Sequence, residues 1–224
     1  MVGPDLAARC RALDVEYQVA SGAVSALRGV EASFERGRLS VITGPSGSGK
    51  SSLLRAFAGL QRPRAGQVEI DGCDITRLRA GQRRWLRRRR LGVVLQDPAD
   101  NLVAYLRADE QVELAARLRG TDGAEAPEML DAVGLAGRHH CFPAELSGGE
   151  QQRVAFAAGA VGQPTLLLAD EPTAELDAAA GATLVAIMRG LVSRGTTLVV
   201  ASHDAAVVSA ADHVVQLRDG RVVS

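Results

Sequence analysis

The sequence predicts an α/β fold with a mostly parallel sheet, an N-terminal antiparallel β subdomain and an inserted α-helical lobe. The first observation is a set of short aliphatic runs, at 39–44, 91–96, 165–170, 197–202 and 213–217. Uninterrupted apolar strands of this length are typical of a parallel sheet that is covered on both faces. Helical patterns separate several of the runs, which is the order of βαβ units. Residues 11–37 instead alternate apolar and polar side chains, which indicates half-exposed antiparallel strands.

The 224 residues are enough for one large domain that carries an inserted lobe. Between Pro98 and about Phe142 the strand signal vanishes and helical periodicity replaces it. We therefore expect a single domain over residues 1–224, with its α/β core and β subdomain at about 11–97 and 143–224. The helical lobe is expected at about 98–142.

Composition limits the partners of the chain. Its 26 basic and 26 acidic residues balance, so we expect no overall attraction to nucleic acid or to an anionic membrane. No run approaches the ~20 apolar residues that span a bilayer, and the N-terminus lacks an apolar stretch of signal-peptide length. The three cysteines, without metal-ligand spacing, fit a reduced cytosolic setting.

Residues 79–90, RAGQRRWLRRRR, form the one charge run, and Arg62, Arg64 and Arg77 extend it into a basic patch. We expect a solvated helix with Trp85 and Leu86 facing the core, which is the usual fate of such a run. A nucleic-acid contact is the less favoured alternative, because aromatic residues for stacking make up only 3% of the chain.

The stretch GPSGSGKS at 44–51 matches G-x-x-x-x-G-K-[ST] between an aliphatic strand and a helical pattern, the context of a phosphate-binding P-loop. The core is therefore predicted to be that of a P-loop NTPase. Lys50, the only lysine in the chain, is expected at the β- and γ-phosphates, and Ser51 at Mg²⁺. The predicted nucleotide-binding residues of this segment, which by themselves do not say which NTPase it is, are Gly44, Pro45, Ser46, Gly47, Ser48, Gly49, Lys50, Ser51 and Ser52.

A second element, TLLLADE, ends in Asp170 and Glu171 at the carboxyl end of a predicted buried strand, where α/β folds bind ligands. We expect Asp170 to hold Mg²⁺ and Glu171 to polarise the attacking water. The stretch LSGGEQQR at 146–153 places a serine and two glycines directly before a predicted helix.

With these motifs in order, the chain resembles the nucleotide-binding domain of ATP-binding cassette (ABC) proteins over about residues 11–223. Further matches are Gln96 at a strand end, AELD at 174–177 and His203 in ASHD. The resemblance implies that LSGGE grips the γ-phosphate of an ATP held by a second subunit. It thereby implies a head-to-tail homodimer around two ATP molecules, with ATP contacts at Ser147, Gly148, Gly149 and Glu150 and a dimer interface at Ser147, Gly148, Gly149 and Asp177.

The remaining roles also follow from the resemblance. Glu171 is implied as the general base, with His203 holding the attacking water, and Gln96 as a contact of Mg²⁺ that senses the helical lobe. Tyr17 resembles the aromatic residue that stacks on adenine; an ordinary strand residue in a half-buried sheet is the rival interpretation.

The segment from Cys73 to Asp97 is similar to the small ATPases of macrolide export, lipoprotein release and FtsE-like cell-division systems. This implies an ATPase, with ATP and Mg²⁺ as cofactors, that drives a separate integral membrane permease by export or by force transmission. It would lie in the cytoplasm, peripheral on the cytoplasmic face of the cell membrane, and bind no nucleic acid. The alternative is a soluble ABC ATPase acting on DNA or ribosomes, which generally carries two cassettes or a long coiled-coil insertion.

Overall fold

The computed structural model describes residues 5–19 and 22–223 and centres on a six-stranded sheet with the order β10-β9-β3-β8-β7-β6. Five of these strands run parallel and β10 pairs antiparallel with β9 at one edge. They are β3 (Leu39–Thr43), β6 (Leu91–Val94), β7 (Leu166–Asp170), β8 (Leu198–Ala201), β9 (His213–Arg218) and β10 (Arg221–Val222). Each aliphatic run of the sequence thus contains a parallel strand, and the predicted α/β class is confirmed.

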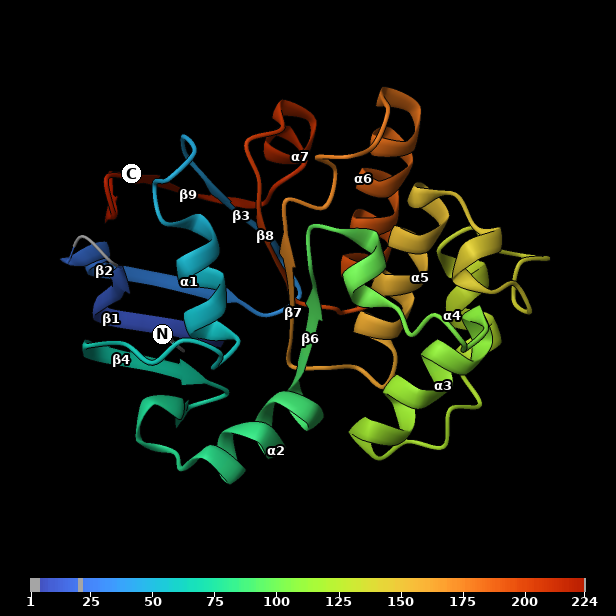
Figure 1. Cartoon of the computed structure of the whole chain (residues 1–224), viewed down its shortest axis with the longest axis horizontal. Helices are drawn as coiled ribbons and strands as arrows, with labels where there is room; N and C mark the ends of the chain where they lie inside the picture. The colour runs from blue at the N-terminus through green and yellow to red at the C-terminus, as the bar shows by residue number, and fades with distance from the viewer. Residues whose placement is uncertain (1–4, 20–21, 224) are drawn as a thin grey trace.

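The central strands are buried on both faces, which explains why their sequences are apolar without alternation. Along β8, for example, Leu198 and Val200 belong to one hydrophobic cluster and Val199 and Ala201 to the other. Successive strand side chains point to opposite faces, so a strand covered on both sides needs an apolar residue at every position. Figure 1 shows the two layers on either side of these strands.

A four-stranded antiparallel sheet, with the order β2-β1-β4-β5, covers one side of the molecule together with the helix α1 (Lys50–Phe57). Its strands are β1 (Leu6–Val19), β2 (Gly22–Glu35), β4 (Ala65–Ile70) and β5 (Cys73–Asp74). Buried residues of β1, β2, β4 and α1 form one cluster with the facing side of β7, β8 and β9. The predicted antiparallel subdomain is therefore present, and β4 and β5 extend it beyond the segment that the sequence pattern indicated.

Helices cover the opposite face of the parallel sheet (Figure 1). They are α3 (Ala108–Arg119), α4 (Ala126–Ala132), α5 (Gly148–Ala160), α6 (Ala178–Ser193) and α7 (Ala205–Ser209). The expected lobe at about 98–142 contains the 3₁₀ turn η2 (Pro98–Asn101), α3 and α4. Residues of α3 and α4 share one hydrophobic cluster with α5 and with Val94 of β6, so the lobe packs directly on the core through α5. The boundaries of the lobe, at about residues 98 and 142, remain a prediction.

The charge run forms the helix α2 (Ala80–Arg90), and one part of its predicted orientation is wrong. Leu86 is buried as expected, but the side chain of Trp85 is 54% exposed. Adjacent residues on a helix point about 100° apart, so a single apolar contact with the core admits only one of the two. None of the helices in the described part of the chain has the length and apolar character that a bilayer crossing requires.

Arg119 joins the lobe to the core at the end of α3. Its guanidinium is largely buried and donates to the carbonyls of Ala158, Gly159 and Val161 at the end of α5, and to that of Leu91 at the start of β6. Burial lowers the pKa of Arg119 to about 10. Replacing this side chain leaves several carbonyl groups without the charged donor that they have in the native protein.

We expect Arg119→Leu to lower the free energy of unfolding by about 3 kcal/mol, because hydrogen bonds from a charged donor are lost together in a buried site. Urea denaturation at neutral pH measures the change. Arg117→Leu is the matched control: Arg117 is 66% exposed and pairs only with Glu113, so its loss should cost less than about 1 kcal/mol. Equal losses in the two variants would contradict this assignment.

Candidate functional site

The loop between β3 and α1 is shaped by glycines that approach other backbone segments closely. A Cβ on Gly44 would lie 2.1 Å from the carbonyl oxygen of Leu217, and one on Gly49 would lie 2.6 Å from that of Ala26. Both glycines also adopt positive φ angles, which other residues rarely tolerate. Helix α1 starts directly after Gly49 with no side-chain cap and no acidic residue in its first turn. Its N-terminal N–H groups and its positive dipole end are therefore available to an anion.

Lys50 lies at the base of this loop with its side chain only 8% exposed. Its ammonium donates to the carbonyls of Gly44 (3.0 Å) and Pro45 (3.4 Å), and lies 3.2 Å from a carboxylate oxygen of Glu171. The one lysine of the chain thus bridges the loop and the end of β7. An anion entering the loop competes with Glu171 for this cation.

Acidic side chains extend from the end of β7. Asp170 accepts a hydrogen bond of 3.0 Å from the Ser51 hydroxyl, and burial raises the pKa of its carboxyl group. Glu171 follows with a φ of 43°, a left-handed conformation that is uncommon outside glycine and clusters at functional sites. Its carboxylate lies 3.0 Å from Nδ1 of His203, which follows β8 and is 71% exposed.

These groups surround a cavity of about 510 Å³, the phosphate cavity. The residues that line it are Ala26, Gly44, Pro45, Ser46, Gly47, Gly49, Lys50, Ser51, Ser52, Gln96, Glu171, Ala174 and His203. Most of the residues that the sequence analysis assigned to one ATP site are thus brought together. Ala26 and Ala174 were not identified, because a small apolar residue carries no chemical signal in a sequence.

Tyr17 lies next to this cavity rather than in its wall. Its hydroxyl donates to Ser52 at 3.2 Å, and its ring packs, half buried, against the cluster beneath the antiparallel sheet. Both contacts are those of a strand residue in a half-buried sheet, and the neighbouring Ser52 keeps the tyrosine at the cavity edge.

The residues predicted to contact the ATP of a second subunit, and the dimer interface, lie outside the phosphate cavity. Ser147 caps α5: its hydroxyl accepts from the Glu150 amide, and the Glu150 carboxylate accepts from the Ser147 amide at 2.9 Å. The latter bond lowers the pKa of Glu150. Ser147, Gly148 and Gly149 do not line the phosphate cavity. Asp177 is exposed and caps α6, accepting from the amide of Ala180 at 2.8 Å.

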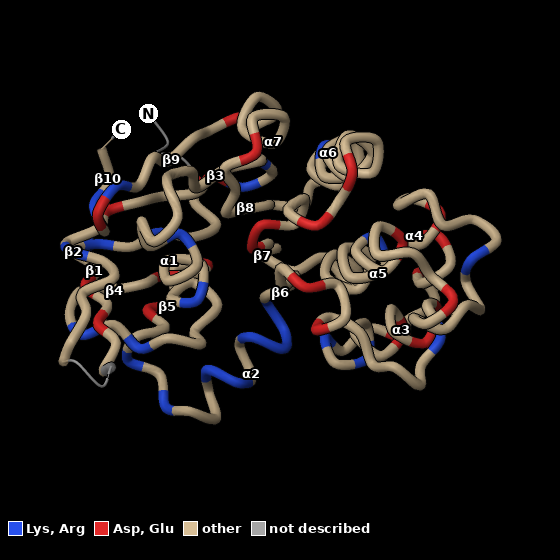
Figure 2. Tube along the Cα trace, turned by 45° about the horizontal axis from the view of Figure 1, so that its top comes forward, with Lys and Arg blue, Asp and Glu red and all other residues tan. Residues whose placement is uncertain are grey.

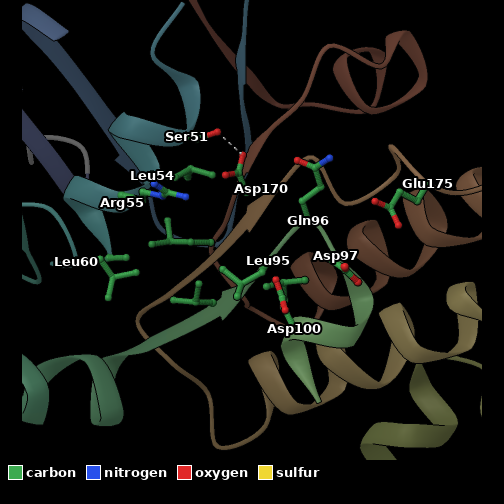
Figure 3. A pocket seen from close by; sticks show the side chains of 14 residues that line it. Ser51, Leu54, Arg55, Leu60, Leu95, Gln96, Asp97, Asp100, Asp170 and Glu175 are labelled. Carbon is green, nitrogen blue, oxygen red and sulfur yellow. Dashed lines mark hydrogen bonds between the residues drawn. The ribbon is translucent and has the colours of Figure 1, made fainter. Parts of the chain in front are cut away.

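A second cavity of about 390 Å³, the inter-lobe groove, lies between α1, β6 and the start of the helical lobe (Figure 3). Its lining residues are Ser51, Leu54, Arg55, Ala58, Leu60, Val93, Val94, Leu95, Gln96, Asp97, Asp100, Leu168, Asp170 and Glu175. Leu60 is 56%, Leu95 is 40% and Val93 is 38% exposed, so exposed apolar side chains gather in the wall of this groove. Gln96 and Ser51 line both this groove and the phosphate cavity.

The parallel sheet, the glycine-rich loop and the paired carboxylates define a P-loop NTPase. Residues 27–174 match the ABC transporter family. The chain is 40% identical to an ABC transporter ATP-binding protein of Thermotoga maritima, over 92% of this chain and 89% of that protein. The chain therefore belongs to the ABC transporter family, and the predicted assignment as an ABC-type ATPase is confirmed at this level.

More distant similarities fit this family. The chain is 38% identical to the macrolide export ATP-binding/permease protein MacB of Sodalis glossinidius over 93% of this chain, which amounts to 32% of that protein. The chain thus spans about a third of the length of this export relative. A dimeric structure of the ATP-binding cassette MJ0796 bound to ADP and Pi superposes with a TM-score of 0.87 at 32% identity, covering 97% of both chains. The predicted fold class is confirmed by this match.

We expect Asp170→Asn to raise the urea midpoint of the nucleotide-free protein at pH 7. Because burial raises the pKa of Asp170, the folded state disfavours the ionised carboxylate, and this cost is present above the folded-state pKa. The cost disappears as the pH falls below the ordinary pKa of aspartate, about 3.9, so the two proteins should converge there. Urea midpoints measured from pH 7 downward test this.

The matched control is Asp219→Asn. Asp219 is exposed and has a φ of 50°, a conformation that asparagine also tolerates. Its midpoint should follow the parent protein at every pH. A stabilisation of the Asp170 variant that persists unchanged at acidic pH would show that charge burial is not its cause.

Proposed function

We propose that this chain is an ATP-hydrolysing subunit that closes head to tail with a second copy around two ATP–Mg²⁺ and drives a separate membrane permease. The observation that carries the proposal is the position of Gln96, which lines both the phosphate cavity and the inter-lobe groove. One side chain is thereby exposed to the state of the nucleotide and to whatever occupies the groove. A protein that only binds nucleotide does not need a residue that lines both the nucleotide site and a second groove.

The phosphate cavity fits the triphosphate of ATP. Its glycines leave backbone amides uncovered, α1 supplies its positive end, and Lys50 adds a cation. The hydroxyl of Tyr17 donates to Ser52 in the cavity wall, and its ring would stack on adenine from this position.

The residues present also fit Mg²⁺. This ion takes oxygen ligands and is commonly held by one or two carboxylates together with substrate phosphates and waters. The hydroxyl of Ser51 and the carboxylate of Asp170, 3.0 Å apart, offer such a pair, and Gln96 offers a further oxygen from the opposite wall (Figure 3). When bound, Mg²⁺ would neutralise charge on the transferred phosphoryl group.

Glu171 is the proposed general base. Its carboxylate is 13% exposed and is held by Lys50 on one side and His203 on the other. When phosphate oxygens attract Lys50 into the loop, the Glu171 carboxylate loses its ion pair. A lone pair of this carboxylate then takes a proton from the attacking water. His203, which is mostly exposed, then remains to hold this water and the γ-phosphate in line.

The dimer is inferred from what the phosphate cavity lacks. The N-terminus of α5, with Ser147 and two glycines, resembles an anion site but does not line the cavity of its own chain. A head-to-tail second copy supplies this terminus, and Asp177 would lie in the same interface. The similar cassette MJ0796 has been solved as a dimer, which supports this arrangement.

The permease would dock in the inter-lobe groove, which presents Leu60, Val93 and Leu95 beside Asp97 and Asp100. The chain would then be peripheral on the cytoplasmic face of the membrane. Relatives named for macrolide and pyoverdine export join ATP-binding and permease parts in one protein. By analogy, the task here is export or force transmission across the membrane.

We expect Glu171→Gln to bind ATP, to lose turnover by about 10²–10⁴-fold, and to accumulate an ATP-bound dimer, because amide nitrogen and oxygen cannot accept the proton. Phosphate release and size-exclusion chromatography with and without ATP measure the two effects. Lys50→Ala is the contrasting variant, which should lose nucleotide binding or turnover without forming the dimer. Hydrolysis at the parent rate by the Glu171 variant would refute the assignment of the base.

We expect Leu60→Glu/Leu95→Glu to abolish recovery of an integral membrane protein with the tagged chain from detergent-solubilised host membranes, because buried carboxylates would face an apolar partner. Mass spectrometry identifies what is recovered. The matched control is Leu114→Glu, an exposed leucine of α3 (40%) outside the groove, which should leave recovery unchanged. Recovery of only ribosomal or DNA-associated proteins with the parent chain would favour the alternative ABC ATPase that acts on those machines.

A further inference from the structure

Helix α2 carries six of the arginines in the charge run, and they divide into two sets. The inner set is tied to the rest of the chain: Arg83 and Arg87 donate to the carbonyls of Leu78 and Gly59, Arg89 to that of Arg119, and Arg90 to Asp71. The side chains of the outer set, Arg84 and Arg88, make no hydrogen bond or ion pair with any residue from 5–19 or 22–223. The inner set therefore fixes the helix, and the outer set serves no visible purpose in the fold.

The outer set shares its face of α2 with Trp85, the only tryptophan of the chain. Positions 84, 85 and 88 are related by helical spacings that place them side by side on one surface. Trp85 is 54% exposed, which is unusual for so large a ring, and no other aromatic residue occurs in α2. We call Arg84, Trp85 and Arg88 the outer face of α2. Figure 2 shows the concentration of basic residues along this helix.

The outer face carries positive charge that the chain does not compensate. Arg84 and Arg88 are four positions apart, a spacing at which like charges destabilise a helix. Beneath them, burial and the neighbouring Arg62 and Arg87 lower the pKa of Arg83, which shows how closely the guanidinium groups are crowded. The chain as a whole is neutral, so this excess is local. A bound anion on the outer face relieves the repulsion.

Helix α2 lies beside the inter-lobe groove, and its inner side makes the contact. Arg87 donates to the carbonyl of Gly59 at 3.0 Å, and the next residue, Leu60, lines the groove. β6, which supplies Val93 to the groove, begins directly after α2. If the groove receives a membrane permease, as in the proposed function on which this inference rests, α2 lies on the membrane side of the chain.

We propose that the outer face of α2 binds the anionic phospholipid headgroups of the membrane beside the permease. A tryptophan between cations on the exposed side of a helix is the pattern of side chains that lie at a membrane surface. Each arginine near an anionic leaflet contributes an attraction that adds to those of its neighbours. Single-stranded nucleic acid would instead need several aromatic platforms, and this face has one. The interaction would hold the ATPase at the membrane independently of nucleotide.

The test uses the purified full chain, without nucleotide, and vesicles of phosphatidylcholine with or without phosphatidylglycerol. We expect co-sedimentation only with the anionic vesicles, decreasing as salt is added. The emission of Trp85 should shift to the blue on binding, and since the chain has no other tryptophan, this signal reports the outer face itself. Arg84→Gln/Arg88→Gln should weaken binding by about tenfold or more.

The matched control is Arg11→Gln/Arg28→Gln, which removes the same charge at two exposed arginines of the antiparallel sheet. It should bind vesicles as the parent chain does. Equal losses in the two double variants, sedimentation without a shift in Trp85 emission, or equal binding to neutral vesicles would each overturn the proposal. The proposal is also overturned if the chain does not bind anionic vesicles and binds an acidic protein segment instead. The vesicles contain neither permease nor ATP, so these outcomes are independent of the dimer and docking tests.

Discussion

The constraint on which the molecule depends is that the central strands of its parallel sheet are buried on both faces. Along β7 and β8, every side chain before the strand end is therefore apolar. Parallel strands also end at the same edge, so the residues after β3, β7 and β8 are brought together although they are far apart in the sequence. Lys50, Glu171 and His203 meet in this way. The concentration of chemistry at one edge is thus a consequence of hydrophobic burial elsewhere.

The ion pair of Lys50 and Glu171 balances the charges of this edge. Both side chains are mostly buried, and each would be costly there without the other. A slim ammonium suits the loop, because it reaches two carbonyls and a carboxylate from one point, whereas a planar guanidinium needs a wider space. This explains why the single lysine occurs here in a chain that otherwise uses arginine. The pair also makes the carboxylate of Glu171 sensitive to any anion that attracts Lys50.

The sequence was sufficient where local backbone determines the outcome, and insufficient where distant contacts do. The turn between the strand and the helix at 44–51 was predicted from its motif, because the positive φ angles of Gly44 and Gly49 are a local property of the backbone. Strand β4 was missed because only its last residues alternate clearly, and its pairing depends on β1. Helical spacing could not decide between Trp85 and Leu86, since only packing selects the inward residue. The walls of the inter-lobe groove had no local signal, because they come from segments that meet only in the fold; only the family resemblance pointed to Gln96 as the residue beside the helical lobe.

Some arginines of α2 stabilise the fold, and the others are left available for binding. Arg87 donates to the carbonyl of Gly59 just beyond α1, and Arg89 to that of Arg119 at the end of α3, so each cation meets the negative end of a helix. Arg119 in turn donates to carbonyls at the end of α5. Helix α2 is therefore fastened at once to the helix of the P-loop and to the helical lobe. Its outer face is thus presented by a helix that is held on two sides.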